Sequence, residues 1–310
     1  MRLLWSLVWL AFAASANPFM TESVGSGQLE ERSSHLVKRS RSKCGPNIDT
    51  SSSSEKRSVG YIRFERNVSI PLEKRMELPK RTMGAFYRRE LPKMTEAVVP
   101  HEEADIATDM STAVLTSFDD LQLDPHEEYS TGAQHISGCT MLYLISRKGV
   151  YATHWWESVS FAPDKIWLKK SLTQPKLFKK TVIDMLTKGG RYHPKLDADA
   201  IEDDYIKAYI VRPTTTHAEK EGDEGYTKEW EQVRTTVGKI VPTLQDRSRW
   251  RDIKYQALNN KDPALNDLSG TAGKNLFKFD PAHKIGRGQT QHYAALWVED
   301  EKTPYHLDQW

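Results

Sequence analysis

The chain contains little cysteine, little net charge and almost no long hydrophobic sequence. Only Cys44 and Cys139 occur in 310 residues, so no disulfide-rich scaffold is available and at most one intramolecular bond can form. The formal net charge is +2, which predicts neither nucleic-acid binding nor a polybasic membrane arm. After the N-terminal segment no apolar run is long enough to span a bilayer. We therefore expect a soluble mature chain without membrane insertion.

Several catalytic and binding motifs are also missing. The ten histidines have neither zincin nor zinc-finger spacing, so we expect no metal site. The Gly286-Arg287-Gly288 stretch has too few glycines for a phosphate loop, and no Gly-x-Ser-x-Gly nucleophile elbow occurs. The carboxylates form no distinctive pair of the glycosidase kind. We therefore expect the chain to need no metal or organic cofactor.

Residues 1–16 have the composition of a secretory signal peptide. Arg2 supplies the positive charge, Leu3–Ala14 form a short apolar core, and Ala14-Ser15-Ala16 places small residues at a cleavage site. A membrane anchor is the alternative, but the apolar run is short for a bilayer. The pattern predicts a secreted, extracellular protein.

Residues 17–57 predict a disordered spacer or pro-segment, because they hold few large apolar residues and a serine run. The dibasic pairs Lys38-Arg39 and Lys56-Arg57 resemble prohormone-type processing sites; an unprocessed solvated tail is the alternative. We expect deletion of this segment to leave the melting temperature nearly unchanged. Asn67-Val68-Ser69 is an N-glycosylation sequon.

Residues 58–310 predict a single α+β domain, with a β-sandwich or mixed sheet core flanked by helices. Periodic apolar residues and helix-ending glycines predict helices over 174–188 and 227–239, and a third over 102–122. Residues 71–100 are rich in charge and proline and predict irregular structure. The expected strands are 58–66, 140–145, 150–156, 205–211, 251–258, 275–279 and 291–298.

The strands over 140–145 and 150–156 predict a β-hairpin that brings two reactive side chains together. A turn centred between Arg147 and Lys148 places Met141 opposite His154. Residues two apart on a strand share a face, and so do opposed residues, so Cys139 and His154 should be diagonal neighbours. A register shift of one residue would separate them.

A thiol beside an imidazole forms a nucleophile–base pair, because histidine can take the thiol proton and stabilise the thiolate. Gly138 removes a side chain beside the thiol, which allows a substrate carbonyl to approach. The backbone N–H groups of Gly138 and Cys139 could stabilise an oxyanion. This arrangement predicts a catalytic pair.

Two other interpretations of Cys139 stay open. One is a disulfide with Cys44, which a secreted chain with two cysteines permits. Against it, Cys44 lies in the segment that we expect to be disordered or removed. The other is a buried, unreactive thiol.

The motif Ile136-Ser137-Gly138-Cys139, with His154 following, resembles the Leu-Ser-Gly-Cys motif of the toxin-type glutamine deamidases. These include the cytotoxic necrotizing factor catalytic domain, the bacterial lethal-factor deamidases and the chemoreceptor glutamine deamidases. The resemblance covers residues 134–161. It implies a β-sandwich surrounded by helices, with Cys139 as nucleophile and His154 as base. The thiolate would attack a glutamine side-chain amide of a protein or peptide, ammonia would leave, and water would release glutamate.

Other residues near the motif are assigned by position. Several family members carry a threonine where this chain has Ala133, and the resemblance allows a backbone carbonyl as the third group. Ser137, Gly138 and Trp156 are expected on the substrate or oxyanion side; for Trp156 the alternative is a core residue. The alternative function is a non-catalytic, secreted, toxin-like interaction module that keeps the hairpin, or a Cys44–Cys139 disulfide, for structure.

Overall fold

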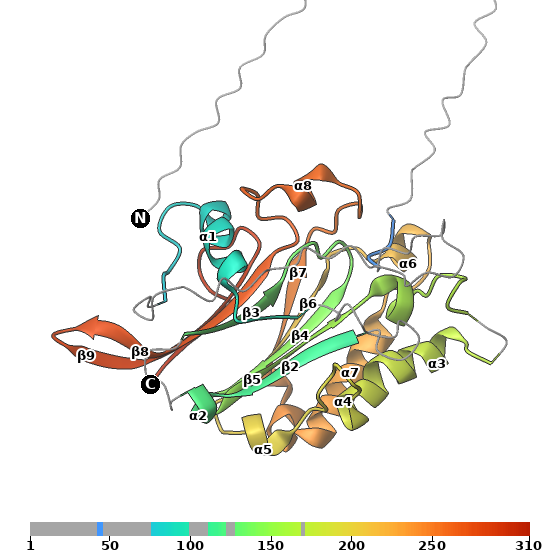
Figure 1. The fold of residues 1–310 in the computed structure, drawn as a ribbon. Helices are drawn as coiled ribbons and strands as arrows, with labels where there is room; N and C mark the ends of the chain where they lie inside the picture. Colours follow the sequence, from blue (N-terminus) through green and yellow to red (C-terminus); the bar gives the residue numbers. More distant parts are fainter. Residues whose placement is uncertain (1–41, 46–75, 99–110, 122–127, 169–170) are drawn as a thin grey trace, which may run out of the picture. The chain divides into compact units, whose positions relative to one another are not determined.

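The computed structural model describes residues 42–45, 76–98, 111–121, 128–168 and 171–310. The chain divides into two units, Met1–Arg39 and Ser40–Trp310, and all of the described residues belong to the second. The described residues form two five-stranded mixed sheets with helices beside them (Figure 1). The expected α+β class is confirmed.

The first sheet carries the predicted hairpin at its centre. Its strands, in spatial order, are β2 (Ser111–Ser117), β5 (Gly149–Trp155), β4 (Thr140–Ile145), β6 (Lys207–Pro213) and β7 (Trp250–Tyr255). All neighbours are antiparallel except β6 and β7, which are parallel. Every residue of β4 and β5 is buried, as expected for central strands covered on both faces.

The second sheet is built around a long hairpin. Its strands, in spatial order, are β1 (Glu96–Ala97), β3 (Tyr129–Ala133), β8 (Asn275–Gly286), β9 (Gln289–Val298) and β10 (His306–Gln309). Gly286-Arg287-Gly288, which offered no phosphate loop, is the turn of this hairpin. All three residues have positive φ, which favours glycine at the two outer positions.

Alternate residues of β4 face two different apolar clusters. Met141 and Tyr143 join Phe277 of the second sheet in the cluster between the sheets. Leu142 and Leu144 join the cluster that the helices cover. The alternation follows from the two-residue repeat of a strand, and it places the first sheet between the second sheet and the helices.

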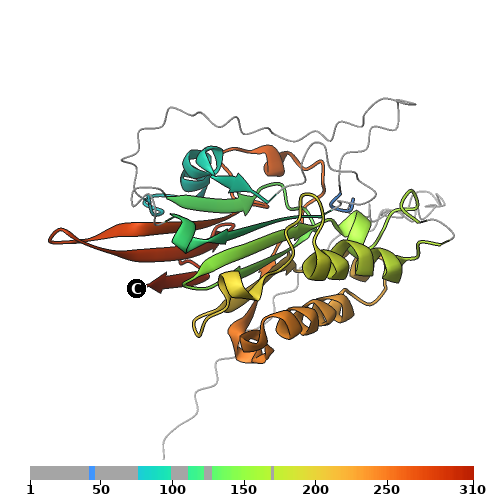
Figure 2. The same cartoon turned by 60° about the horizontal axis from the view of Figure 1, so that its bottom comes forward.

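The two long predicted helical segments are confirmed. The first consists of α3 (Gln174–Phe178), the π-helical η3 (Lys179–Ile183) and α4 (Asp184–Lys188), and ends at Gly189 with φ 73°. The second is α7 (Thr227–Ile240), which buries Trp230, Val233 and Val237. Both lie on the same side of the first sheet (Figure 2). The shorter helical elements are α1 (Met83–Glu90), η1 (Leu91–Lys93), α2 (Phe118–Leu121), η2 (Glu157–Phe161), α5 (Ala198–Ile201), α6 (His217–Lys220), η4 (Pro242–Gln245), η5 (Arg247–Arg249) and α8 (Pro263–Asn266).

Two local predictions are wrong. Within 102–122 the described residues form β2 and only the short α2, because Thr112, Val114 and Thr116 are β-branched and β2 pairs with β5 along its full length. Within 71–100, α1 is a helix whose Phe86 and Tyr87 are buried against the second sheet. Tertiary packing outweighs local composition in both places.

Most predictions about the N-terminal region lie outside the described residues. These are the signal peptide over 1–16, the strand over 58–66 and the sequon at Asn67. Of the spacer over 17–57, the structure describes residues 42–45. Among the described residues, no helix is both long and apolar enough to cross a membrane.

Candidate functional site

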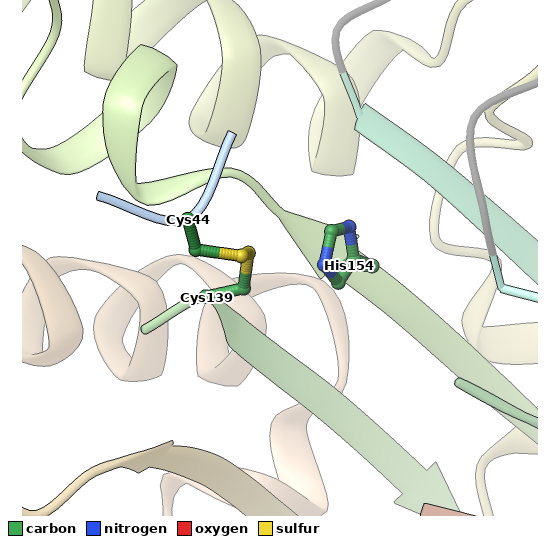
Figure 3. A group of neighbouring side chains, drawn as sticks. All are labelled: Cys44, Cys139 and His154. Carbon is green, nitrogen blue, oxygen red and sulfur yellow. A yellow bond between two sulfur atoms is a disulfide. The ribbon is translucent and has the colours of Figure 1, made fainter. Parts of the chain in front are cut away.

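The hairpin has the register that the sequence predicts. Met141 pairs with His154, so His154 and Cys139 lie on the same side of the first sheet. A ring nitrogen of His154 and the Sγ atoms of Cys139 and Cys44 all lie within 4.8 Å of one another (Figure 3). The histidine ring and the motif cysteine are therefore neighbours on one face of the sheet.

The chain turns into β4 at Gly138, immediately before Cys139. Gly138 has φ 151°, a conformation that a residue with a Cβ atom rarely adopts. The Tyr255 hydroxyl donates a hydrogen bond of 2.8 Å to the carbonyl oxygen of Cys139. Ser137 Oγ donates to Asn260 Oδ1 at 3.1 Å, which fixes the loop ahead of the cysteine. The thiol position is thus set by the backbone on both sides.

Cys139 is bonded to Cys44 in a disulfide with a Cα–Cα distance of 5.4 Å. Both residues are fully buried. The bond corrects the expectation that Cys44 lies in a disordered segment, because the residues around Cys44 are packed. In this form of the protein Cys139 is not a thiol, and the alternative of a buried free thiol is excluded.

Residues Ser42–Gly45, called the strap below, lie against the start of η2. The Ser158 N–H donates to the Cys44 carbonyl oxygen at 2.9 Å. The Cys44 N–H donates to Glu157 Oε2 at 3.3 Å. At these residues the expectation of a removable, unpacked segment is corrected: deletion over 17–57 would remove packed residues and a disulfide.

Glu157 also belongs to the site, although nothing in its local sequence indicates that it is buried. Its side chain is fully buried. Its Oε2 accepts the hydrogen bond from the Cys44 N–H. Its Oε1 accepts hydrogen bonds from the His217 N–H at 3.0 Å and from the Tyr226 hydroxyl at 3.1 Å. Its donors lie far away in the sequence, so only the folded chain reveals them.

His154 lies in an apolar surrounding. It is 4% exposed, and burial lowers the pKa of its imidazole to about 3. Nδ1 is buried without a hydrogen-bond partner among the described residues. Trp156 packs edge-on against the ring at a centroid distance of 4.5 Å. The imidazole is therefore neutral at neutral pH and able to accept a proton.

Of the other residues near the motif, His135 points to a different partner. Its Nε2 lies 3.0 Å from Asn266 Oδ1. Ala133 offers no side-chain group, and its N–H donates to Asn275 Oδ1 at 3.2 Å. Neither supplies a third catalytic group in this arrangement.

The buried histidines predict a loss of stability in mild acid. Burial lowers the pKa of His154 and His306 to about 3 and that of His193 to about 4. The unfolded chain binds protons near pH 6.5 whereas the folded chain does not, so the stabilisation is complete above pH 6.5 and declines as pH falls toward the folded pKa. Each histidine contributes up to about 1.4 kcal/mol per pH unit.

Urea unfolding between pH 6.5 and 5 measures this effect, because most carboxylates stay ionised there. The variant His306→Gln should show a shallower dependence on pH than the wild type. Identical slopes for the two proteins would contradict the assignment to His306.

No protein-family model and no curated protein matches the chain. A comparison with solved structures finds the C-terminal domain of CNFy from Yersinia pseudotuberculosis, with 9% sequence identity and a TM-score of 0.27. The match covers 64% of this chain and 57% of that one. At this score the likeness supports no statement about fold or function, and the site geometry must carry any functional conclusion.

Proposed function

We propose that this chain is a secreted cysteine amidohydrolase of the glutamine deamidase type, with Cys139 as nucleophile and His154 as base. The observation that carries the proposal is the approach of a His154 ring nitrogen to within 4.8 Å of Cys139 Sγ in a buried site. The Ile136-Ser137-Gly138-Cys139 motif, through its resemblance to the deamidases, supports glutamine as the substrate group.

The proposed enzyme acts in its reduced form, because a disulfide sulfur carries no thiol proton and cannot attack an amide. A dithiol reductant supplies two electrons and two protons, and its own thiols become a disulfide. The bond between Cys44 and Cys139 breaks, and each sulfur becomes a thiol. The oxidised form described here is then a latent state.

In the reduced form His154 takes the proton of Cys139, and the thiolate attacks the amide carbon of glutamine. The carbonyl oxygen becomes an oxyanion beside the N–H groups of Gly138 and Cys139. His154 returns the proton to the amide nitrogen, the C–N bond breaks and ammonia leaves. Water loses a proton to His154 and attacks the thioester, whose C–S bond breaks to give glutamate and the free thiol.

Burial keeps the ring of His154 neutral, and the same lowered pKa makes the ring a weak base. The first step therefore depends on the thiolate that forms beside the ring. Once the proton moves, the imidazolium lies beside a thiolate, and the opposite charges stabilise each other more strongly in a buried site than in bulk water.

The disulfide supports a second candidate function, a non-catalytic secreted interaction module. A fully buried bond between residues 95 positions apart can serve structure alone. In that case the hairpin and His154 would be packing elements, and reduction would weaken the protein without producing activity.

Thiol alkylation separates the two functions. After reduction, Cys139 should react rapidly with iodoacetamide at neutral pH, and His154→Ala should slow that reaction by about tenfold or more, because the thiolate loses its partner. Mass spectrometry of digested protein assigns the label to Cys139 or Cys44. The Cys44→Ser protein is the control that isolates Cys139, because the Cys44 sulfur also lies within 4.8 Å of the His154 ring nitrogen. Slow labelling of Cys139 that His154→Ala leaves unchanged would favour the interaction module.

A further inference from the structure

The first two strap residues are held by side-chain contacts. Ser42 Oγ donates to Asn259 Oδ1 at 2.8 Å and accepts from the Asn260 N–H at 3.0 Å. Lys43 Nζ donates to the Ala162 carbonyl oxygen at 2.8 Å and lies 3.0 Å from Asp164 Oδ1. Two separate loops thus bind this short stretch, one before α8 and one after η2.

Cys44 is held by contacts that any residue at its position could make. Its N–H donates to the Glu157 carboxylate, and its carbonyl oxygen accepts from the Ser158 N–H. Neither hydrogen bond involves the Cys44 side chain. Among the described residues, its side chain packs in the cluster between the sheets and is covalently bonded to Cys139. A peptide bound in the same way would therefore direct its own side chain at the nucleophile.

Gly45 lies in a confined place. A Cβ atom added there would be 1.9 Å from Ser158 Oγ and 2.9 Å from Ser158 Cβ. Both distances are far below ordinary contact, so the position accepts glycine and rejects larger residues unless Ser158 moves.

From these contacts we propose that the strap marks the substrate groove, which binds a peptide segment with a basic residue, then the reacting glutamine, then glycine. The inference rests on the proposed function for the reaction, and the strap acts as a covalently attached substrate mimic. Asp164 selects the basic residue, Glu157 and Ser158 hold the main chain, and Ser158 selects glycine. A glutamine reaches one bond further than a cysteine, a difference that rotation of its side chain can absorb.

The groove can be tested without deamidation, by forming a mixed disulfide. In full-length Cys44→Ser protein, the Cys139 thiolate attacks a Ser-Lys-Cys-Gly peptide whose cysteine carries a thionitrobenzoate group. A new S–S bond joins peptide and Cys139, and the coloured thionitrobenzoate anion leaves and is measured. Replacing the peptide's lysine by glutamate should slow the reaction about two- to fivefold, the range for a partly exposed ion pair.

Asp164→Lys should reverse this preference. The matched control is Asp199→Lys, which makes the same charge change in α5, beside the opposite end of the hairpin. An alanine in place of the peptide's glycine should slow the reaction, and Ser158→Gly should restore it. If Cys44→Ser folds poorly, the same peptides are added to reduced wild type after the dithiol is removed, and mass spectrometry of digested protein measures the peptide bonded to Cys139.

Equal rates of mixed-disulfide formation for all peptides in all variants would overturn the proposed substrate groove, whatever reaction the protein catalyses. Selective mixed-disulfide formation without ammonia release from any glutamine peptide would support the groove and contradict the deamidase. The two failures are thus distinguishable.

Discussion

Replacing Cys139 by serine is expected to abolish ammonia release from glutamine-bearing substrates in the presence of a dithiol. A serine hydroxyl has nearly the size of the thiol but is far less acidic, so His154 cannot activate it at neutral pH. The rate of ammonia release should fall about a thousandfold or more, because His154 contributes to catalysis only when the nucleophile is present. A coupled assay for ammonia measures it.

The assay in a dithiol also supplies its own stability control. Neither the wild type nor Cys139→Ser has the disulfide under these conditions, so their melting temperatures should agree closely. A difference in activity then reports the chemistry of one sulfur atom. Equal ammonia release by the two proteins would sink the enzymatic hypothesis.

The geometry of the pair could be predicted from sequence because it depends on local rules. Strand alternation and one turn are enough to place Met141 opposite His154, and with it the histidine on the side of Cys139. The α+β class followed from the same alternating patterns. The residues over 111–117 show where such rules fail, because spaced apolar residues suit a helix until a partner strand such as β5 is available.

The closed state of the site could not be predicted from local sequence. The strap binds Glu157, Ser158 and Asp164, which lie more than a hundred residues further along the chain. Nothing in the sequence near Cys44 indicates these contacts. The composition of residues 17–57 predicts disorder for the segment as an average. It cannot reveal that four of these residues, Ser42–Gly45, make specific contacts. The burial of Glu157 could not be predicted for the same reason, since it depends on donors from His217 in α6 and from Tyr226, the residue before α7.

Cys44→Ser is expected to give the opposite activity from Cys139→Ser at the same cost in stability. Both variants lose the same disulfide, which closes a loop across 95 positions, and each should lose about 2–5 kcal/mol of unfolding free energy relative to the oxidised wild type. Cys44→Ser keeps the nucleophile, so it should release ammonia from glutamine substrates without any reductant. The oxidised wild type should be inactive until a dithiol is added. Urea unfolding and the ammonia assay, both without reductant, measure the two effects.

The pair of variants separates structure from chemistry because the lost covalent bond is common to both. If the disulfide is purely structural, the two proteins should behave alike, equally weakened and equally inactive. If it masks a nucleophile, one variant is constitutively active and the other is inactive in every redox state. A Cys44→Ser protein that folds, exposes a reactive Cys139 and still releases no ammonia would leave the thiol without a deamidase function. The Cys44→Ser protein can be combined with His154→Ala as a final test. Loss of ammonia release in the double variant would support a latent catalytic site made of Cys139 and His154 and closed by the strap.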